Sequence, residues 1–151
     1  MTNNNFRSVY YANGIWVAGD NISSNGLYYS TDGINWTQSN VTNNKFNSVY
    51  YANRIWVAAS YSDVGIYYST DGMTWTQSDM TSGNFRNVHY GNGIWVAGSI
   101  NGLYYSTDGI RWTQSNITSG DFDRLYYANG IWVTGGGDTG LYYSTNGMTW
   151  T

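Results

Sequence analysis

The chain has 151 residues, of which 10% are charged and 19% are aromatic, and its formal net charge is −3. Such an aromatic-rich composition excludes a disordered chain, and the absence of a basic cluster argues against nucleic acid as a partner. No apolar run approaches the roughly 18 residues that a membrane helix needs, so no membrane partner is predicted. The absence of cysteine excludes disulfides and thiolate metal sites.

A repeat of nearly 40 residues organises the sequence. Phenylalanine residues begin the units at spacings of 40, 39 and 37 residues, and tryptophan residues end them at spacings of 39, 37 and 38. The four units of this single domain, 1–151, span about 2–41, 42–80, 81–117 and 118–151. This period is typical of four-stranded propeller blades, and helical-pair repeats share it.

The first unit predicts four strands joined by short turns. Asn13-Gly14 is the residue pair that a tight type I′ hairpin needs, because both positions adopt positive φ. Asp32-Gly33 marks a second turn. No 3.6-residue apolar period occurs, which disfavours helical repeats. The β-branched and aromatic segments between the turns give the expected strands: Val9–Ala12, Ile15–Ala18, Leu27–Ser30 and Asn35–Gln38.

These strands are apolar on both faces. In the second strand Ile15 and Val17 point to one side of the sheet and Trp16 and Ala18 to the other. A sheet with one face in water would alternate apolar with polar residues, so each sheet must be covered on both sides. Stacking the sheets around an axis does this. The predicted fold is an all-β propeller of four-stranded antiparallel blades, four to a chain.

The turn between the third and fourth strands carries a recognisable motif. Ser30-x-Asp32-Gly33-x-x-Trp36 resembles the Asp-box of bacterial neuraminidase-type repeats, and it recurs in every unit. The resemblance covers essentially the whole chain and implies that the box is a structural fold-back, away from any active face. It gives that role to Ser30, Asp32, Trp36, Ser69, Asp71, Trp75, Ser106, Asp108, Trp112, Ser144, Asn146 and Trp150.

The sequence favours a protein that is not an enzyme. Sialidases share these boxes, and by resemblance their chemistry needs a glutamate base beside a tyrosine nucleophile, but the chain has no glutamate. The loops after the second strands carry Asp20, Asp63 and Asp138, one in each of three units. His89 occupies the position that tyrosine has in the other units. No phosphate-binding loop or metal-ligand spacing occurs, so no cofactor and no metal are predicted.

Differences between the near-identical units indicate where a ligand could bind. They concentrate in the loops after the second strands, at the start of the innermost strands and in the linkers. Strand alternation places all three on one face. Arginine, tyrosine and asparagine there suit sugar hydroxyls or a protein loop, and neutral variation of exposed loops is the alternative. The candidate ligand-binding residues are Arg7, Asn47, Tyr61, Arg86, Arg124, Asp20, Asp63 and Asp138.

Three functions remain open from the sequence. The first is a multivalent binding module, most plausibly for glycans, since repeated weak sites give avidity. The second is a self-assembling structural scaffold of amplified, excised or engineered repeats with no small-molecule ligand. The third is a glycoside hydrolase. We expect the chain itself to be its partner, in a head-to-tail homodimer that closes eight blades, with a closed four-bladed monomer or another ring size as alternatives.

Overall fold

The computed structural model describes residues 4–22, 24–137 and 139–151, in which fifteen β-strands and no helix occur. The strands form four antiparallel sheets, and neighbours in each sheet are also neighbours in the chain. The all-β prediction is confirmed. The sheets are β1 (Phe6–Ala12), β2 (Ile15–Asp20), β3 (Leu27–Ser30) and β4 (Thr37–Gln38); β5 (Phe46–Ala52), β6 (Ile55–Ser60), β7 (Ile66–Ser69) and β8 (Thr76–Gln77); β9 (Phe85–Gly91), β10 (Ile94–Ser99), β11 (Gly102–Ser106) and β12 (Thr113–Gln114); and β13 (Arg124–Ala128), β14 (Ile131–Gly135) and β15 (Leu141–Ser144).

The strand bounds differ from the sequence prediction at two places. β1 and β2 extend beyond the apolar segments, because Phe6 pairs with Asp20 across a bulge. β4 is shorter than expected, since Asn35 is held in the preceding turn by Asp32. The fourth sheet has three strands, and only Thr151 exchanges backbone hydrogen bonds with Tyr143 where a fourth strand would pair.

The first hairpin of every blade is a turn with two positive φ angles. Asn13, Asn53, Asn92 and Asn129 have φ of 50° to 52°, and glycine follows three of them at 78° to 81°. In the second blade Arg54 takes the glycine position with φ of 64°. Asparagine adopts the left-handed region readily, whereas arginine is strained there because its Cβ approaches the following carbonyl oxygen.

Replacing Arg54 with glycine is therefore expected to stabilise the chain. The removed strain of about 1–2 kcal/mol is partly offset by the greater freedom of glycine in the unfolded state, which leaves a gain of about 0.5–1 kcal/mol. Urea denaturation measures this gain. Asn53→Gly serves as the control and should change stability less, because asparagine is already suited to its position. If Arg54→Gly lowers the free energy of unfolding, the backbone of Arg54 is not strained in this turn.

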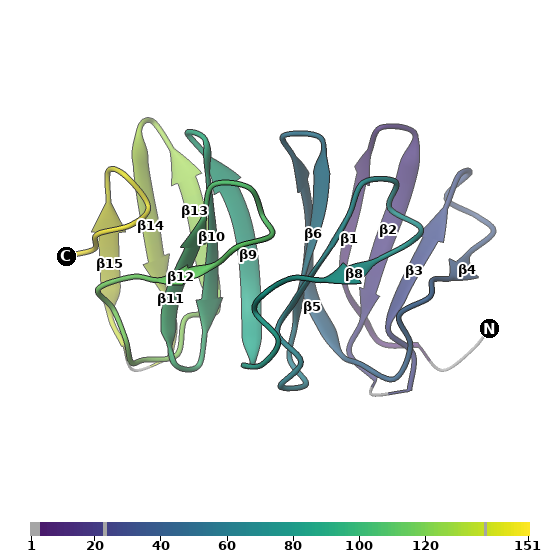
Figure 1. The fold of residues 1–151 in the computed structure, drawn as a ribbon, viewed down its shortest axis with the longest axis horizontal. Helices are drawn as coiled ribbons and strands as arrows, with labels where there is room; N and C mark the ends of the chain where they lie inside the picture. Colours follow the sequence, from purple (N-terminus) through teal and green to yellow (C-terminus); the bar gives the residue numbers. More distant parts are fainter. Residues whose placement is uncertain (1–3, 23, 138) are drawn as a thin grey trace.

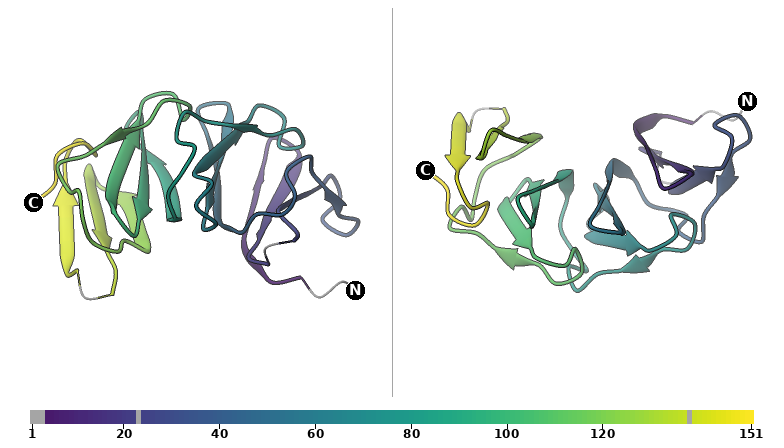
Figure 2. Two further views of the ribbon diagram at one scale, coloured as in Figure 1. Left: turned by 60° about the horizontal axis from the view of Figure 1, so that its bottom comes forward. Right: turned by 90° about the horizontal axis from the view of Figure 1, so that it is seen from above.

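The four sheets are blades of an open arc. Figure 1 shows them side by side, and the view from above in Figure 2 shows β1–β4 at one end and β13–β15 at the other. The first strands of successive blades, β1, β5, β9 and β13, adjoin one another. The described residues form an arc that does not close, so the closed four-bladed monomer among the sequence-based alternatives is not observed.

The hydrophobic core lies in the joints between blades. In each joint one blade contributes an isoleucine, a valine and a leucine or isoleucine, and the next contributes a phenylalanine, a valine or leucine and two tryptophans. The first joint contains Ile15, Val17 and Leu27 from one blade and Phe46, Val49, Trp56 and Trp75 from the next. The expectation that these sheets are apolar on both sides because neighbours cover both sides is confirmed for the inner blades.

A row of aromatic rings crosses the joints. The ring centroids of Tyr10 and Tyr50 lie 4.8 Å apart, those of Tyr50 and His89 4.6 Å, and those of His89 and Tyr126 5.4 Å. Each of the first three rings also meets a tryptophan of the following blade nearly edge-on. Burial lowers the pKa of His89, so the ring is neutral at pH 7 and serves as one more aromatic in the row.

Candidate functional site

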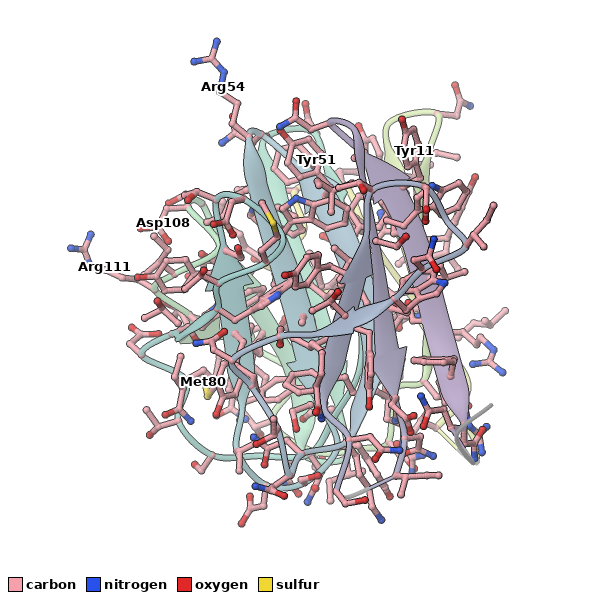
Figure 3. All side chains as sticks on the ribbon, turned by 90° about the vertical axis from the view of Figure 1, so that its right-hand side faces the viewer. Tyr11, Tyr51, Arg54, Met80, Asp108 and Arg111 are labelled. Atoms are coloured by element: carbon pink, nitrogen blue, oxygen red, sulfur yellow. The ribbon has the colours of Figure 1, made fainter. Side chains whose placement is uncertain are left out.

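The arc has two rims. The first-strand turns and the box turns form one rim, called here the hairpin face; Arg54 and Tyr51 mark it in Figure 3, where Arg111 projects beside Asp108. The loops after the second strands (21–22, 24–26, 61–65, 100–101, 136–137 and 139–140) and the linkers (39–45, 78–84 and 115–123) form the opposite rim, called here the loop face. The predicted ligand-binding residues that the structure describes lie at this rim.

Five of the eight predicted residues line one polar hollow on the loop face, with a volume of about 470 Å³. The chain brings them from all four blades, because the innermost strands of the arc begin around a common centre. They are Arg7, Asn47, Tyr61, Arg86 and Arg124. Asn21 and Asp123 also line the hollow and were not among the predicted residues.

Arg86 is the most constrained cation of the hollow. Its Nε donates to Asp121 Oδ1 at 2.6 Å and its Nη2 donates to Asp121 Oδ2 at 2.8 Å and to the Tyr61 hydroxyl at 3.2 Å. The guanidinium carbon also lies 4.6 Å from the centre of the Tyr61 ring. Although burial lowers the pKa of Arg86, hydrogen bonding and charge attraction from Asp121 raise it overall. The ion pair with Asp121 fixes the position of the Arg86 guanidinium group.

Asp20 and Asp63, two of the predicted aspartates, lie apart from the hollow. Asp20 is fully buried, and its carboxylate accepts hydrogen bonds from the backbone N–H groups of Asn5 and Ile22 and from the Asn25 side chain. Asp63 accepts from Gly83 N–H at 2.7 Å and ties its loop to the next linker. Both contacts organise loops. Asp138 lies outside the described residues.

The box turns repeat one hydrogen-bond pattern. In the first box the Ser30 hydroxyl donates to Asp32 Oδ1 at 2.9 Å and accepts from Gly33 N–H, while Asp32 Oδ1 accepts from the N–H groups of Ile34 and Asn35. Asn146 accepts the same set in the fourth box. The backbone N–H of Asn35, then its side chain, lowers the pKa of Asp32 strongly.

The box carboxylates make stability depend on pH. Burial would raise the pKa of Asp71 and Asp108, but backbone hydrogen bonds from Thr74 and Arg111 lower it overall. A folded-state pKa below the unfolded value of 3.8 contributes stability above that pH, and the contribution is lost as the pH falls. Replacing Asp32, Asp71 and Asp108 with asparagine should therefore flatten the loss of stability below about pH 4.

Urea midpoints at pH 7 and pH 3 measure this effect. The triple variant is expected to be somewhat less stable at pH 7, because hydrogen bonds to charged acceptors are stronger, and to lose less stability on acidification. The fourth box, which already contains Asn146, shows that asparagine fits the turn. If the triple variant and the unmodified protein lose the same stability between pH 7 and pH 3, groups other than the box carboxylates account for the acid sensitivity.

The two ends of the arc expose apolar residues that are buried at the joints. On the last blade Val133 is 43% exposed and Leu141 is 81% exposed, whereas the equivalent Val17 and Leu27 are fully buried. On the first blade Phe6 is 44% exposed and Val9 is 56% exposed, whereas the equivalent side chains of the inner blades are at most 3% exposed. We call these the last-blade face (Tyr126, Ile131, Val133, Leu141, Tyr143) and the first-blade face (Phe6, Val9, Tyr11, Trp16, Trp36).

The last-blade face is hollowed where a joint would hold the next phenylalanine. A cavity of about 600 Å³ is lined by Leu125, Val133 and Leu141 and by a run of glycines. At the equivalent positions inside the chain, a Cβ on Gly19 would lie 2.9 Å from the Phe46 carbonyl oxygen, and one on Gly98 would also meet Phe122. Gly135 meets atoms of its own loop only. Sequence reasoning expected exposed ends but did not identify these residues, which comparison of equivalent positions between the repeats would have shown.

Neither a metal centre nor a membrane-crossing helix is found in the described ranges. No group of three histidine or aspartate side chains among these residues could hold a metal ion. The same residues contain no helix long and apolar enough to cross a membrane.

The chain is similar to solved structures in fold alone. No protein-family model and no curated protein sequence matches it. The computationally designed Ika8 protein is 10% identical with a TM-score of 0.72, over 94% of this chain and 46% of Ika8, and the designed Ika4 protein is 11% identical with a TM-score of 0.71, over 95% and 92%. An ancestral GH74 enzyme is 16% identical with a TM-score of 0.78, over 97% of this chain and 23% of the enzyme. The chain thus spans less than half of Ika8, and it has the fold of four β-propeller blades.

Proposed function

We propose that this chain is a self-assembling, non-enzymatic propeller scaffold, in which two copies associate head-to-tail and close an eight-bladed ring. One observation carries the proposal: the two exposed end faces are the two halves of the joint that the chain already forms three times. The last-blade face corresponds to the side of the first blade that packs on the second. The first-blade face corresponds to the side of the second blade that receives it.

The phenylalanine contact shows how the faces would fit. Phe46, Phe85 and Phe122 are at most 1% exposed, since each packs against the preceding blade. Among the described residues no blade packs on Phe6, which is 44% exposed, and none fills the cavity beside Val133 and Leu141. Phe6 of a second copy would fill this cavity. Burying such side chains stabilises association by roughly 1.5–3 kcal/mol for each large apolar residue before the costs of association.

The aromatic row supports the same pairing. Tyr126 ends the row, and it is 66% exposed. The ring before it, His89, meets Trp132 of the following blade at an interplanar angle of 86°. By repeat equivalence Tyr126 would meet Trp16 of a second copy. The partner would therefore continue the row without a new kind of contact.

Ring closure sets the number of copies at two. A head-to-tail contact either closes into a ring or grows into a filament. Propellers have typically four to eight blades, and the four sheets described here form an open arc. Two chains would form a ring of eight blades, which lies within this range and would cover both end faces of each chain. The Asp-box assignment belongs to this proposal too, supported by the repeated hydrogen bonds of the box turns.

Glycan binding, which the sequence favours, gains no specific support from the described residues, so self-assembly is proposed in its place. Light scattering after size-exclusion chromatography tests the proposal. The expected molar mass is about twice the 16.9 kDa of one chain, unchanged on dilution well above the dissociation constant. A mass of one chain at all concentrations, or a mass that grows without limit, would overturn the two-copy ring.

A further inference from the structure

We propose that the polar hollow on the loop face is a binding site for a small hydroxylated anion, such as a hydroxy acid or a phosphorylated sugar. The proposal goes beyond ring closure and does not depend on it, because residues of a single chain line the hollow. Such a site would give the scaffold a ligand on its loop face.

The charge of the hollow differs from that of the chain. Arg7, Arg86 and Arg124 line it, and Asp123 is the one carboxylate among its described lining residues. The chain as a whole carries a net charge of −3. With Asp121, which is bonded to Arg86, the hollow has three guanidinium groups and two carboxylates, so a positive excess remains in an acidic protein. A concave surface with an excess of one sign concentrates ions of the other.

The three guanidinium groups are available to different degrees. Asp121 and Tyr61 hold Arg86 in place through Nε and Nη2, so its charge is oriented before a ligand arrives. Arg7 makes no ion pair in the part of the chain that the structure describes. Arg124 Nη1 donates to the Asp123 backbone carbonyl at 3.0 Å and lies 3.8 Å from the Asp123 carboxylate, so this charge is partly paired. Guanidinium groups bind carboxylates and phosphates through paired hydrogen bonds, so we infer that the ligand is an anion.

A hydroxyl group is indicated by the uncharged polar groups of the lining. Asn47 and Tyr61 line the hollow beside the arginines, and the Tyr61 hydroxyl, which accepts from Arg86, can still donate a hydrogen bond. Amide and phenol groups of this kind form hydrogen bonds with ligand hydroxyls. The volume of about 470 Å³ is in the range of small-molecule sites. An anion that also carries hydroxyls therefore fits better than a bare anion or a neutral sugar.

Calorimetry at low ionic strength tests the site with four compounds: citrate, glucose 6-phosphate, inorganic phosphate and glucose. We expect citrate, glucose 6-phosphate or both to bind more tightly than inorganic phosphate, and glucose not to bind. Binding of citrate alone would assign the site to hydroxy acids, and binding of glucose 6-phosphate alone to phosphorylated sugars. No heat from either anion at about 10 mM, or inorganic phosphate binding as tightly as both, would overturn the proposal.

Charge-matched variants separate the hollow from general attraction. Arg7→Gln and Arg124→Gln are each expected to weaken binding about tenfold, the loss of one charge-assisted hydrogen-bonding group. Arg54→Gln removes the same charge on the hairpin face and should leave the affinity unchanged (Figure 3). Equal weakening by Arg54→Gln would contradict a localised site. The same titration on the single-chain Val133→Lys variant keeps this result independent of the ring, because that variant retains every residue of the hollow.

Discussion

Replacing Val133 with lysine is expected to convert the two-chain ring into single chains. Val133 lies on the last-blade face, where it is 43% exposed in one chain, so the substitution leaves the packing within the chain intact. Each of the two joints of the ring contains one Val133, and both would have to bury an unpaired ammonium group. Such burial costs several kcal/mol, or about a hundredfold or more in affinity for each joint. Light scattering should show the mass fall to that of one chain.

Mixing two variants tests the head-to-tail direction. Val9→Asp alters the first-blade face and should also give single chains. A mixture of Val133→Lys and Val9→Asp chains can form one joint from two unmodified faces. The other joint brings the introduced carboxylate beside the introduced ammonium, because the equivalent Val17 and Val49 belong to the same cluster. The mixture is therefore expected to recover the two-chain mass.

Two outcomes would contradict the head-to-tail ring. A symmetric contact between identical faces would leave one of the two single variants as a two-chain species, because that variant keeps the contacting face unmodified in both copies. Thr113→Lys is the control for an added charge, because Thr113 is exposed on β12 away from both end faces. If Thr113→Lys also separates the chains, general repulsion and not the joint accounts for the effect.

Replacing Gly65 with alanine is expected to be among the most destabilising single substitutions in the chain. Gly65 has φ of +76°, where a residue with a Cβ is strained by about 1–2 kcal/mol. The added Cβ would also collide with the Met80 carbonyl oxygen of the linker, which is backbone and cannot rotate away. Overpacking adds about 1–3 kcal/mol, so the expected loss is about 2–5 kcal/mol of folding free energy.

The fourth blade supplies a matched control for this prediction. Gly140 has the same φ of +76°, but a Cβ added there would have no atom beyond its chain neighbours within 4 Å. Gly140→Ala should therefore lose about 1–2 kcal/mol, from backbone strain alone. Urea denaturation of both variants in the Val133→Lys background keeps association out of the comparison. Equal losses would mean that the linker moves to accept the methyl group.

Local patterns in the sequence predicted the strands and turns well. The hairpin turns follow from Asn-Gly pairs, because these residues adopt positive φ at little cost, and the structure confirms φ near 50° for the asparagines. Arg54 departs from the pattern in sequence but not in conformation, since the surrounding strands impose the same turn. The short β4 was less predictable, because the side chain of Asp32 takes the backbone N–H of Asn35 before pairing can begin.

The candidate site was predictable only in part. Arg7, Asn47, Tyr61, Arg86 and Arg124 come together because variable positions of each repeat share one rim of the arc. The sequence around Asp20 has the polar composition of an exposed loop. Asp20 is nevertheless fully buried, because backbone N–H groups of the loop surround its carboxylate. Whether a loop carboxylate faces solvent or its own loop depends on contacts with the preceding linker, which no local pattern contains.

By itself the sequence determined the repeat, the strand order and the need for sheets covered on both sides, because side-chain period and turn chemistry act over a few residues. Only the tertiary structure decided that the four blades stop as an open arc and that Phe6 and Leu141 remain exposed at its ends. Those outcomes depend on the angle at which whole blades pack against each other. Many side-chain contacts between repeats set this angle together, and the sequence of one repeat does not contain it.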